Sequence, residues 1–222
     1  MNEEEQNSEK VSETEERILN LSYRMISQLL HYDLEGKDDT TCLRLQGNQI
    51  GQFPTGIFDP LKKLEILKLG YNRFRKLPSR LFSSLKNLRE LYLDASRLEE
   101  LPPSLFASQE QLRILSLSGN RLSGFPAGLF SPLKNLKSLD LSENRIIELR
   151  MEDLQGLNQL EILNLSKMKS LLYLDPRIAS ECPNLKTLAV WKTSVPANTV
   201  SEIQNLLPQC RICTEYKEIR LS

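Results

Sequence analysis

The sequence is poor in the residues on which catalysis and metal binding usually depend. Its 222 residues include one His, one Trp and four Cys, and 29 Lys and Arg balance 29 Asp and Glu to a formal charge of zero. No phosphate-binding loop, G-x-S-x-G turn, H-E-x-x-H helix or pair of histidines is present, so we expect no enzyme and no cofactor or metal. Zero net charge argues against a uniformly basic surface and predicts a chain that binds neither nucleic acid nor membrane.

Long apolar runs are also missing. No stretch approaches the roughly 18 residues that a membrane-crossing helix needs, and the acidic first residues lack the features of a secretory signal. The four cysteines, Cys42, Cys182, Cys210 and Cys213, are therefore expected to be reduced thiols. Cys210 and Cys213 have the spacing of half a zinc site, but no second pair or nearby His completes four ligands. The sequence predicts a cytoplasmic protein.

Leucine is abundant, at 43 of 222 residues, and it recurs with a fixed period. A unit of the form Leu-x-x-Leu-x-Leu-x-x-Asn, followed in several copies by Leu-Pro-x-x-x-Phe or Phe-Pro-x-x-x-Phe, returns at a constant spacing. The sixth unit slips by one residue between Lys167 and Ser170. An earlier copy begins at Thr40, and later copies begin at Leu64, Leu88, Leu112, Leu136, Leu160 and, after the slip, Leu185.

These units resemble the leucine-rich repeat family, in its typical 24-residue subtype, over roughly residues 40–195. The resemblance implies an α/β fold: a curved solenoid with short parallel strands on its concave side. The residues agree, because alternating Leu67 and Leu69 describe a strand with one buried face, and stacked coils share one core. In the family, the asparagines satisfy backbone groups where each strand turns, and the phenylalanines stack. These residues are Asn48, Asn72, Asn120 and Asn144, and Phe58, Phe82, Phe106 and Phe130.

Two departures from the repeat have structural consequences. Ser96 replaces the asparagine of the third unit, and its shorter reach predicts a weak point near the middle of the solenoid. The extra residue between Lys167 and Ser170 predicts a bulge in the sixth coil.

The ends of the chain are expected to cap the exposed coil faces. A capping-box spacing at Ser12 and Glu15, followed by apolar residues three and four apart, predicts a cap helix near residues 13–32, with docking of a partner as the alternative role. Another such spacing at Thr199 and Glu202 predicts a short helix and a closing strand, and residues 206–212 resemble the end of cytosolic and bacterial family members. The predicted organisation is an acidic flexible leader 1–12, an N-terminal helical cap 13–39, about six to seven repeats over 40–195 and a C-terminal cap 196–222.

The repeat arranges the concave face as columns of neighbouring side chains. Cationic residues lie toward the N-terminal end and acidic residues lie further along, which orients a partner during encounter. Tyr71, Tyr92 and Trp191 are of the type enriched at interfaces, although singly exposed aromatics are also normal. The predicted partner-binding residues are Arg44, Lys68, Tyr71, Tyr92, Asp94, Asp140, Glu143 and Trp191.

The position after the asparagines is basic in five successive units. This basic edge is interpreted either as a docking strip for an acidic or phosphate-bearing partner or as a common repeat variant neutralised by nearby glutamates. Its residues are Arg73, Arg97, Arg121, Arg145 and Lys169. Residues 1–16 hold seven Glu against one Lys, a charge of −6, so residues 17–222 have +6. The leader is therefore hypothesised to cover the basic edge transiently.

The function that the resemblance implies is noncatalytic protein–protein interaction through the concave face, as a monomeric cytosolic adaptor or effector. Two alternatives stay open. One is an extracellular pattern-recognition or antigen-binding protein, which the repeat type also resembles. The other is a regulatory or substrate-recruiting subunit of an enzyme complex.

Overall fold

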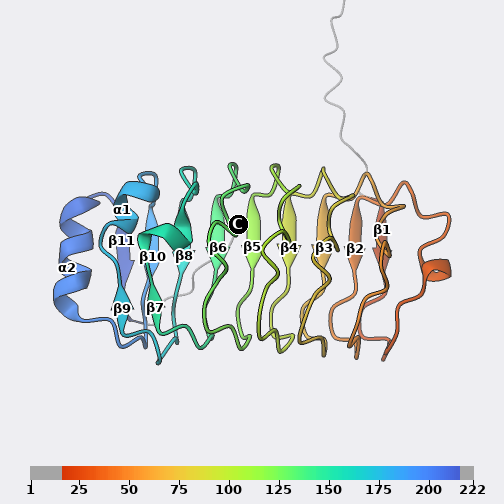
Figure 1. Ribbon diagram of the computed structural model, residues 1–222, viewed down its shortest axis with the longest axis horizontal. Helices are drawn as coiled ribbons and strands as arrows, with labels where there is room; N and C mark the ends of the chain where they lie inside the picture. Colours follow the sequence, from red (N-terminus) through yellow and green to blue (C-terminus); the bar gives the residue numbers. More distant parts are fainter. Residues whose placement is uncertain (1–16, 216–222) are drawn as a thin grey trace, which may run out of the picture.

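The computed structural model describes residues 17–215, and the predicted leader 1–12 lies outside the described residues. Nine parallel strands form one sheet in the order β1-β2-β3-β4-β5-β6-β8-β10-β11 (Figure 1). Their bounds are β1 Ile18–Asn20, β2 Cys42–Arg44, β3 Ile66–Lys68, β4 Glu90–Tyr92, β5 Ile114–Ser116, β6 Ser138–Asp140, β8 Ile162–Asn164, β10 Thr187–Ala189 and β11 Arg211–Cys213. The strands stand in chain order along the long axis, as a solenoid requires.

The chain returns between strands mainly through turns. A second, two-stranded parallel sheet pairs β7 (Glu148–Leu149) with β9 (Tyr173–Leu174). The described helices are short: α1 spans Ile178–Glu181, α2 spans Ala197–Leu206, and 3-10 turns lie at His31–Asp33 and Met151–Leu154. In Figure 1, α2 lies at the C-terminal end of the row of strands.

Strand register confirms the period of the repeat and locates its interruption. Asp140 of β6 lies opposite Asn164 of β8, as the regular period requires, whereas Asn164 lies opposite Ala189 of β10, one position later than the period requires. The β7–β9 pair is shifted by the same single position, since Glu148 lies opposite Tyr173. The extra residue therefore lies after Asn164 and before Tyr173, in agreement with the predicted bulge.

The core runs the length of the solenoid between the sheet and the turns. The central leucine of each of β2 to β6, β8 and β10 is fully buried. Phenylalanines stack in two pairs, with ring centroids 6.4 Å apart for Phe58 and Phe82 and 6.2 Å apart for Phe106 and Phe130. Buried Gln109 stands where neighbouring coils have leucine, and its amide nitrogen donates to the Phe82 carbonyl at 2.7 Å.

The asparagines join consecutive coils, as the family resemblance implied. Asn120 donates from Nδ2 to the carbonyls of Leu93 and Leu117, both at 2.9 Å, and its Oδ1 accepts the backbone N–H of Ser96 and Leu98. The Ser96 hydroxyl is fully buried and lies 3.4 Å from the Leu69 carbonyl. Serine therefore occupies the same place with a longer contact to the preceding coil.

The N-terminal cap is a repeat coil, so the prediction of a cap helix is wrong. Described residues of this region form β1, whose Ile18 lies opposite Cys42, one full period later in the chain. Leu29 and Leu34 are buried at the positions that Phe53 and Phe58 occupy in the next coil. The apolar spacing that suggested a helix is the spacing of the repeat itself, and stacking on β2 stabilises an extended strand instead.

The C-terminal segment contains the expected helix and strand, but the helix begins earlier than its predicted capping box. Pro196 precedes α2 and no side chain caps it, so the spacing of Thr199 and Glu202 does not define its start. Strand β11 pairs with β10 and ends the sheet. All four cysteines are buried free thiols.

Candidate functional site: the concave face and the basic edge

The exposed face of the nine-stranded sheet, here called the concave face, has the columns that the repeat predicted. Arg44, Lys68 and Tyr92 are register neighbours on β2, β3 and β4. The order of charges along the sheet is also as expected, with Arg44 and Lys68 preceding the acidic residues of β4 and β6. The face therefore has a basic N-terminal end and an acidic middle.

Lys68 and Tyr92 form the centre of the N-terminal half of this face. The Lys68 ammonium lies 5.0 Å from the Tyr92 ring centroid, within cation–π range. The Tyr92 hydroxyl donates to the Glu90 carboxylate at 2.9 Å. Burial, followed by the negative charge of Glu90, raises the pKa of Tyr92, so it stays a neutral hydrogen-bond donor at neutral pH.

Tyr71 and Asp94 border this centre. The Tyr71 backbone N–H donates to the Asp94 carbonyl at 2.8 Å, and the Tyr71 side chain is 62% exposed. The Asp94 carboxylate lies directly over Gly70, where an added Cβ would approach its oxygen to 2.5 Å. Partial burial raises the pKa of Asp94. Lys68, Tyr71, Tyr92 and Asp94 thus lie on two adjacent coils, and we call them together the N-terminal patch.

Arg44 lies beside the N-terminal patch with part of its hydrogen-bonding capacity unused. Its Nε is buried and has no hydrogen-bond partner in the structure, and the same holds for Oε1 of Gln46. Buried polar atoms without partners are uncommon in folded proteins. Arg44 is the register neighbour of Lys68 and so extends the patch toward β2.

Asp140 is less available than its sequence position suggested. It is only 8% exposed, and its carboxylate accepts the Ser142 backbone N–H at 2.9 Å and the Asn164 side-chain amide at 3.1 Å. Burial raises its pKa, and these hydrogen bonds partly oppose that rise. Small buried side chains flank it, so Asp140 organises the floor of the face more than it reaches a partner.

Glu143 and Trp191 lie apart from the N-terminal patch. Glu143 forms an ion pair with Lys167 at 2.7 Å, and the Lys167 ammonium lies 5.7 Å from the Trp191 ring centroid. Lys192 lies on the same ring at 4.6 Å. The predicted set of eight residues therefore divides into an N-terminal group, the nearly buried Asp140, and this C-terminal group.

The basic edge is regular in its backbone but uneven in its charge. The N–H groups of Arg73, Arg121 and Arg145 donate to the preceding coil at 2.8–2.9 Å. Arg121 pairs with Glu99 at 3.7 Å, whereas no carboxylate of residues 17–215 forms an ion pair with Arg73, Arg97, Arg145 or Lys169. Neutralisation by glutamate thus affects one residue of the edge, not all five.

A hollow of about 510 Å³ lies at the C-terminal end of the basic edge, and we call it the basic pocket. Four cationic side chains and one carboxylate line it together with two polar residues: Arg145, Lys167, Lys169 and Lys192, with Glu143, Asn144 and Ser170. Lys167 and Lys192 are absent from the sequence-predicted site. The break in the repeat period was the available signal for them.

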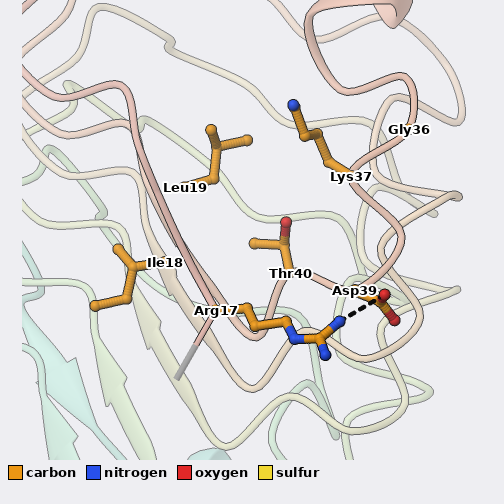
Figure 2. Close-up of a pocket in the computed structure, with 7 residues that line it drawn as sticks. All are labelled: Arg17, Ile18, Leu19, Gly36, Lys37, Asp39 and Thr40. Carbon is orange, nitrogen blue, oxygen red and sulfur yellow. Dashed lines mark ion pairs between the residues drawn. The ribbon is translucent and has the colours of Figure 1, made fainter. Parts of the chain in front are cut away.

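Another hollow, of about 280 Å³, lies at the first coil. Figure 2 shows its lining residues, among which Arg17 forms an ion pair with Asp39 at 2.6 Å. Its walls come from β1 and the turn before Thr40, at the opposite end of the solenoid from the basic pocket. None of the predicted partner-binding residues lines it.

Residues 17–215 show no reactive thiol, metal cluster or membrane-spanning helix. Burial raises the pKa of the Cys182 thiol to about 12 and that of Cys210 to about 11, which disfavours the reactive thiolate. This part of the chain holds no group of three or more metal-ligating side chains. It also holds no helix long and apolar enough to cross a bilayer.

Comparison with known proteins identifies the family to which the fold is similar. The profile of the family described as Leucine rich repeat matches residues 40–98, 86–146 and 110–169. A TLR13 chain, solved in complex with ssRNA13, is 29% identical with a TM-score of 0.72, over 81% of this chain and 25% of that chain. A leucine-rich repeat protein of Leptospira interrogans is 25% identical with a TM-score of 0.58, over 87% of this chain and 59% of that chain. No curated protein matches the sequence.

This chain therefore spans about a quarter of the TLR13 chain and less than two thirds of the Leptospira protein. The exclusion of nucleic acid as a partner is wrong, because a solenoid similar to this one is solved in complex with ssRNA13. The zero net charge did not justify excluding nucleic acid, because local basic surfaces coexist with acidic ones. The profile matches, the regular strand register and the nine parallel strands together show that the chain belongs to the leucine-rich repeat family.

Proposed function

We propose that this chain is a noncatalytic module whose concave face binds a protein partner, centred on the N-terminal patch. The observation that supports it is the exposed Tyr71 beside Lys68, Tyr92 and Asp94 on adjacent coils. Aromatic residues flanked by charges of both signs resemble the anchors that dominate binding energy at protein interfaces. Lys68 and Tyr92 lie on the strands β3 and β4, and Tyr71 and Asp94 lie in the turns that follow them, where a backbone hydrogen bond joins the two coils. Side chains on such a paired backbone lose little conformational entropy on binding.

The partner would present a cationic group to Asp94 and an apolar or aromatic side chain to Tyr71. Arg44, beside Lys68, would bind an acidic group or a carbonyl at the basic end of the face. This order of charges fixes the direction in which the partner lies along the sheet and speeds its encounter.

The proposed setting is the cytoplasm, where the module acts as an adaptor or effector. A count of free thiols after denaturation separates this from the extracellular alternative. Four reactive thiols per chain, matching the four buried free cysteines, support the reducing compartment. Two or none in protein isolated from its native source would contradict it.

The test of the binding face is affinity capture with three forms of the chain. The concave variant replaces Tyr92 and Asp94 with Ala, and the matched control replaces the exposed Arg80 and Lys86, on the turns away from the sheet, with Ala. Both variants are first shown to unfold at the wild-type denaturant midpoint. We expect proteins captured by the wild type and the control to be lost with the concave variant, and equal capture by all three would refute the proposal.

Single-stranded RNA is the second candidate ligand of the same face. The likeness to TLR13 in its complex with ssRNA13 favours it, and so does the combination of Arg44 and Lys68 with exposed aromatic rings, on which bases stack. Nuclease treatment of the captured material distinguishes the two, because RNA-mediated capture disappears after it and direct protein capture persists.

A further inference from the structure

The basic pocket combines two columns of charged side chains with a break in the repeat period. Glu143, Lys167 and Lys192 occupy equivalent places on successive coils, each with a left-handed backbone at φ 58°, 61° and 53°. Arg145 and Lys169 follow two residues later in their coils. Two columns of side chains from the turns after β6, β8 and β10 therefore converge on one hollow of about 510 Å³.

The one-residue insertion shapes this hollow. The strand registers place the additional residue after Asn164 and before Tyr173, in the segment that contains Lys169. Ser170 fixes the widened turn by donating from its hydroxyl to the Ile146 carbonyl at 2.9 Å. Ser194 fixes it from the next coil by donating to the Lys169 carbonyl at 2.8 Å. The bond from Ser194 thereby fixes the backbone of Lys169 at the rim of the pocket.

The charges around the pocket are unbalanced. Four cations face one carboxylate, which leaves a net charge of +3 on the lining residues. Glu143 pairs with Lys167 at 2.7 Å. Among residues 17–215, no carboxylate forms an ion pair with Arg145, Lys169 or Lys192. Three cations crowded on one rim repel one another, so an anion that bridges them lowers the free energy of the site.

We propose that the basic pocket binds a phosphorylated serine or threonine of a protein partner. A phosphate monoester has a charge near −2 and three acceptor oxygens, which matches three cations on one rim better than a single carboxylate does. Arg145 supplies paired donors to two oxygens, and Lys169 and Lys192 supply the balancing charge. This site lies beyond the concave N-terminal patch and is independent of what that patch binds.

The local character of the charge favours a single phosphate group over a nucleic-acid backbone. An RNA strand needs cations that follow it over several nucleotides. Toward the middle of the solenoid, however, Arg121 is paired with Glu99, and Lys76 is paired with Glu100 at 2.7 Å. Positive charge along the basic edge is therefore interrupted at Arg121, whereas Arg145, Lys169 and Lys192 line one hollow.

The test uses a fluorescently labelled short peptide with one phosphoserine among Gly and Ala residues, and its Ser and Glu counterparts. Anisotropy is measured with the full chain, with Lys169→Glu/Lys192→Glu, and with Arg73→Glu/Arg97→Glu. The last variant makes the same charge change on the same edge, outside the pocket. A labelled single-stranded RNA of matched length is the competing probe. Circular dichroism confirms that both variants are folded.

We expect the phosphopeptide to bind more tightly than both counterparts, and to bind about tenfold more weakly to the pocket variant with little change in the control variant. Equal loss in the two variants would show only general charge attraction and overturn the proposal. Absence of binding, or equal binding of the Ser or Glu peptide, would also overturn it. Tighter RNA binding that the pocket variant alone abolishes would reassign the site to nucleic acid.

Discussion

At the scale of single residues, the solenoid depends on side chains that connect one coil to the next. Where a strand ends in a turn, its backbone N–H and C=O groups lose their partners in the sheet, and the side chain of each repeat asparagine bonds to them instead. A buried polar group left without a partner costs about 1–3 kcal/mol. Asn72 reaches the preceding coil's Leu45 carbonyl at 3.0 Å, while the Ser96 hydroxyl lies 3.4 Å from the Leu69 carbonyl. The coil that contains Ser96 is held less tightly by the column of asparagines than the neighbouring coils are.

Exchange of the two residue types tests this difference. Ser96→Asn should raise the free energy of unfolding by about 1 kcal/mol, because it gains a short hydrogen bond to the preceding coil. Asn120→Ser should lower it by a larger amount, because Asn120 makes several buried hydrogen bonds. Urea denaturation measures both. A loss of stability in Ser96→Asn would show that the coil has adapted to serine.

Asp140 makes stability depend on pH in a defined direction. Burial raises its pKa in the folded state above the unfolded value, so the folded chain binds this proton more readily than the unfolded chain does. The desolvation cost is present above the folded pKa and is relieved as the pH falls through it. The stability of the wild type relative to Asp140→Asn should therefore increase from neutral to acidic pH in denaturation experiments. A constant difference would contradict the assignment.

Residue-level roles were predictable where the repeat dictates them. The asparagines, the buried leucines and the columns on β2 to β10 follow from the period of the repeat, because register fixes which side chains are neighbours. The exposure of Asp140 was not predictable, since it depends on how Asn164 and Ser142 close around it. The pairing of Glu143 with Lys167 depends equally on side-chain conformations that a period does not specify.

At the scale of elements, the first coil shows how two periodicities can be confused. Leu21, Ile26 and Leu29 belong both to the apolar series that predicted a helix and to one more repeat. A single short coil has little intrinsic preference between them, and stacking on β2 decides the outcome, since Leu29 and Leu34 enter the shared core. Local pattern alone could not settle this, because the stabilising contacts come from the neighbouring coil.

Truncation of two leucines distinguishes a stacked coil from a loosely docked cap. Leu34 is fully buried, whereas Leu30, in the same turn, is 37% exposed. Leu34→Ala should cost about 3 kcal/mol of unfolding free energy, as for buried leucines elsewhere, and Leu30→Ala much less. Guanidinium denaturation gives both values. Similar small effects at the two positions would indicate that the first coil is not part of the cooperative core.

At the scale of the whole molecule, a zero net charge conceals regions of opposite sign. Residues 1–16 have a charge of −6 and residues 17–222 a charge of +6, while the concave face itself changes sign along its length. The opposite charges of residues 1–16 and 17–222 could be counted from the sequence. It did not show that excess positive charge collects in one pocket, because that depends on where the insertion places Lys169 and Lys192.

The leader should compete with anionic ligands of the basic pocket. Residues 1–11 carry Glu3, Glu4, Glu5 and Glu9, and their removal should strengthen phosphopeptide binding at low salt. The difference should shrink at moderate salt, because screening weakens interactions between exposed charges. Anisotropy titrations of the full and shortened chains measure it. Equal affinities at both salt concentrations would exclude competition by the leader.

The central claim is that the concave face binds a protein through the N-terminal patch, and the dissociation constant of a purified captured partner tests it most directly. Calorimetry with the wild type, Tyr92→Ala/Asp94→Ala and Arg80→Ala/Lys86→Ala compares the two faces. We predict affinity about tenfold or more weaker for the concave variant, as for loss of interface anchors, and wild-type affinity for the control. Equal affinity of both folded variants, or loss only in the control, would contradict the claim.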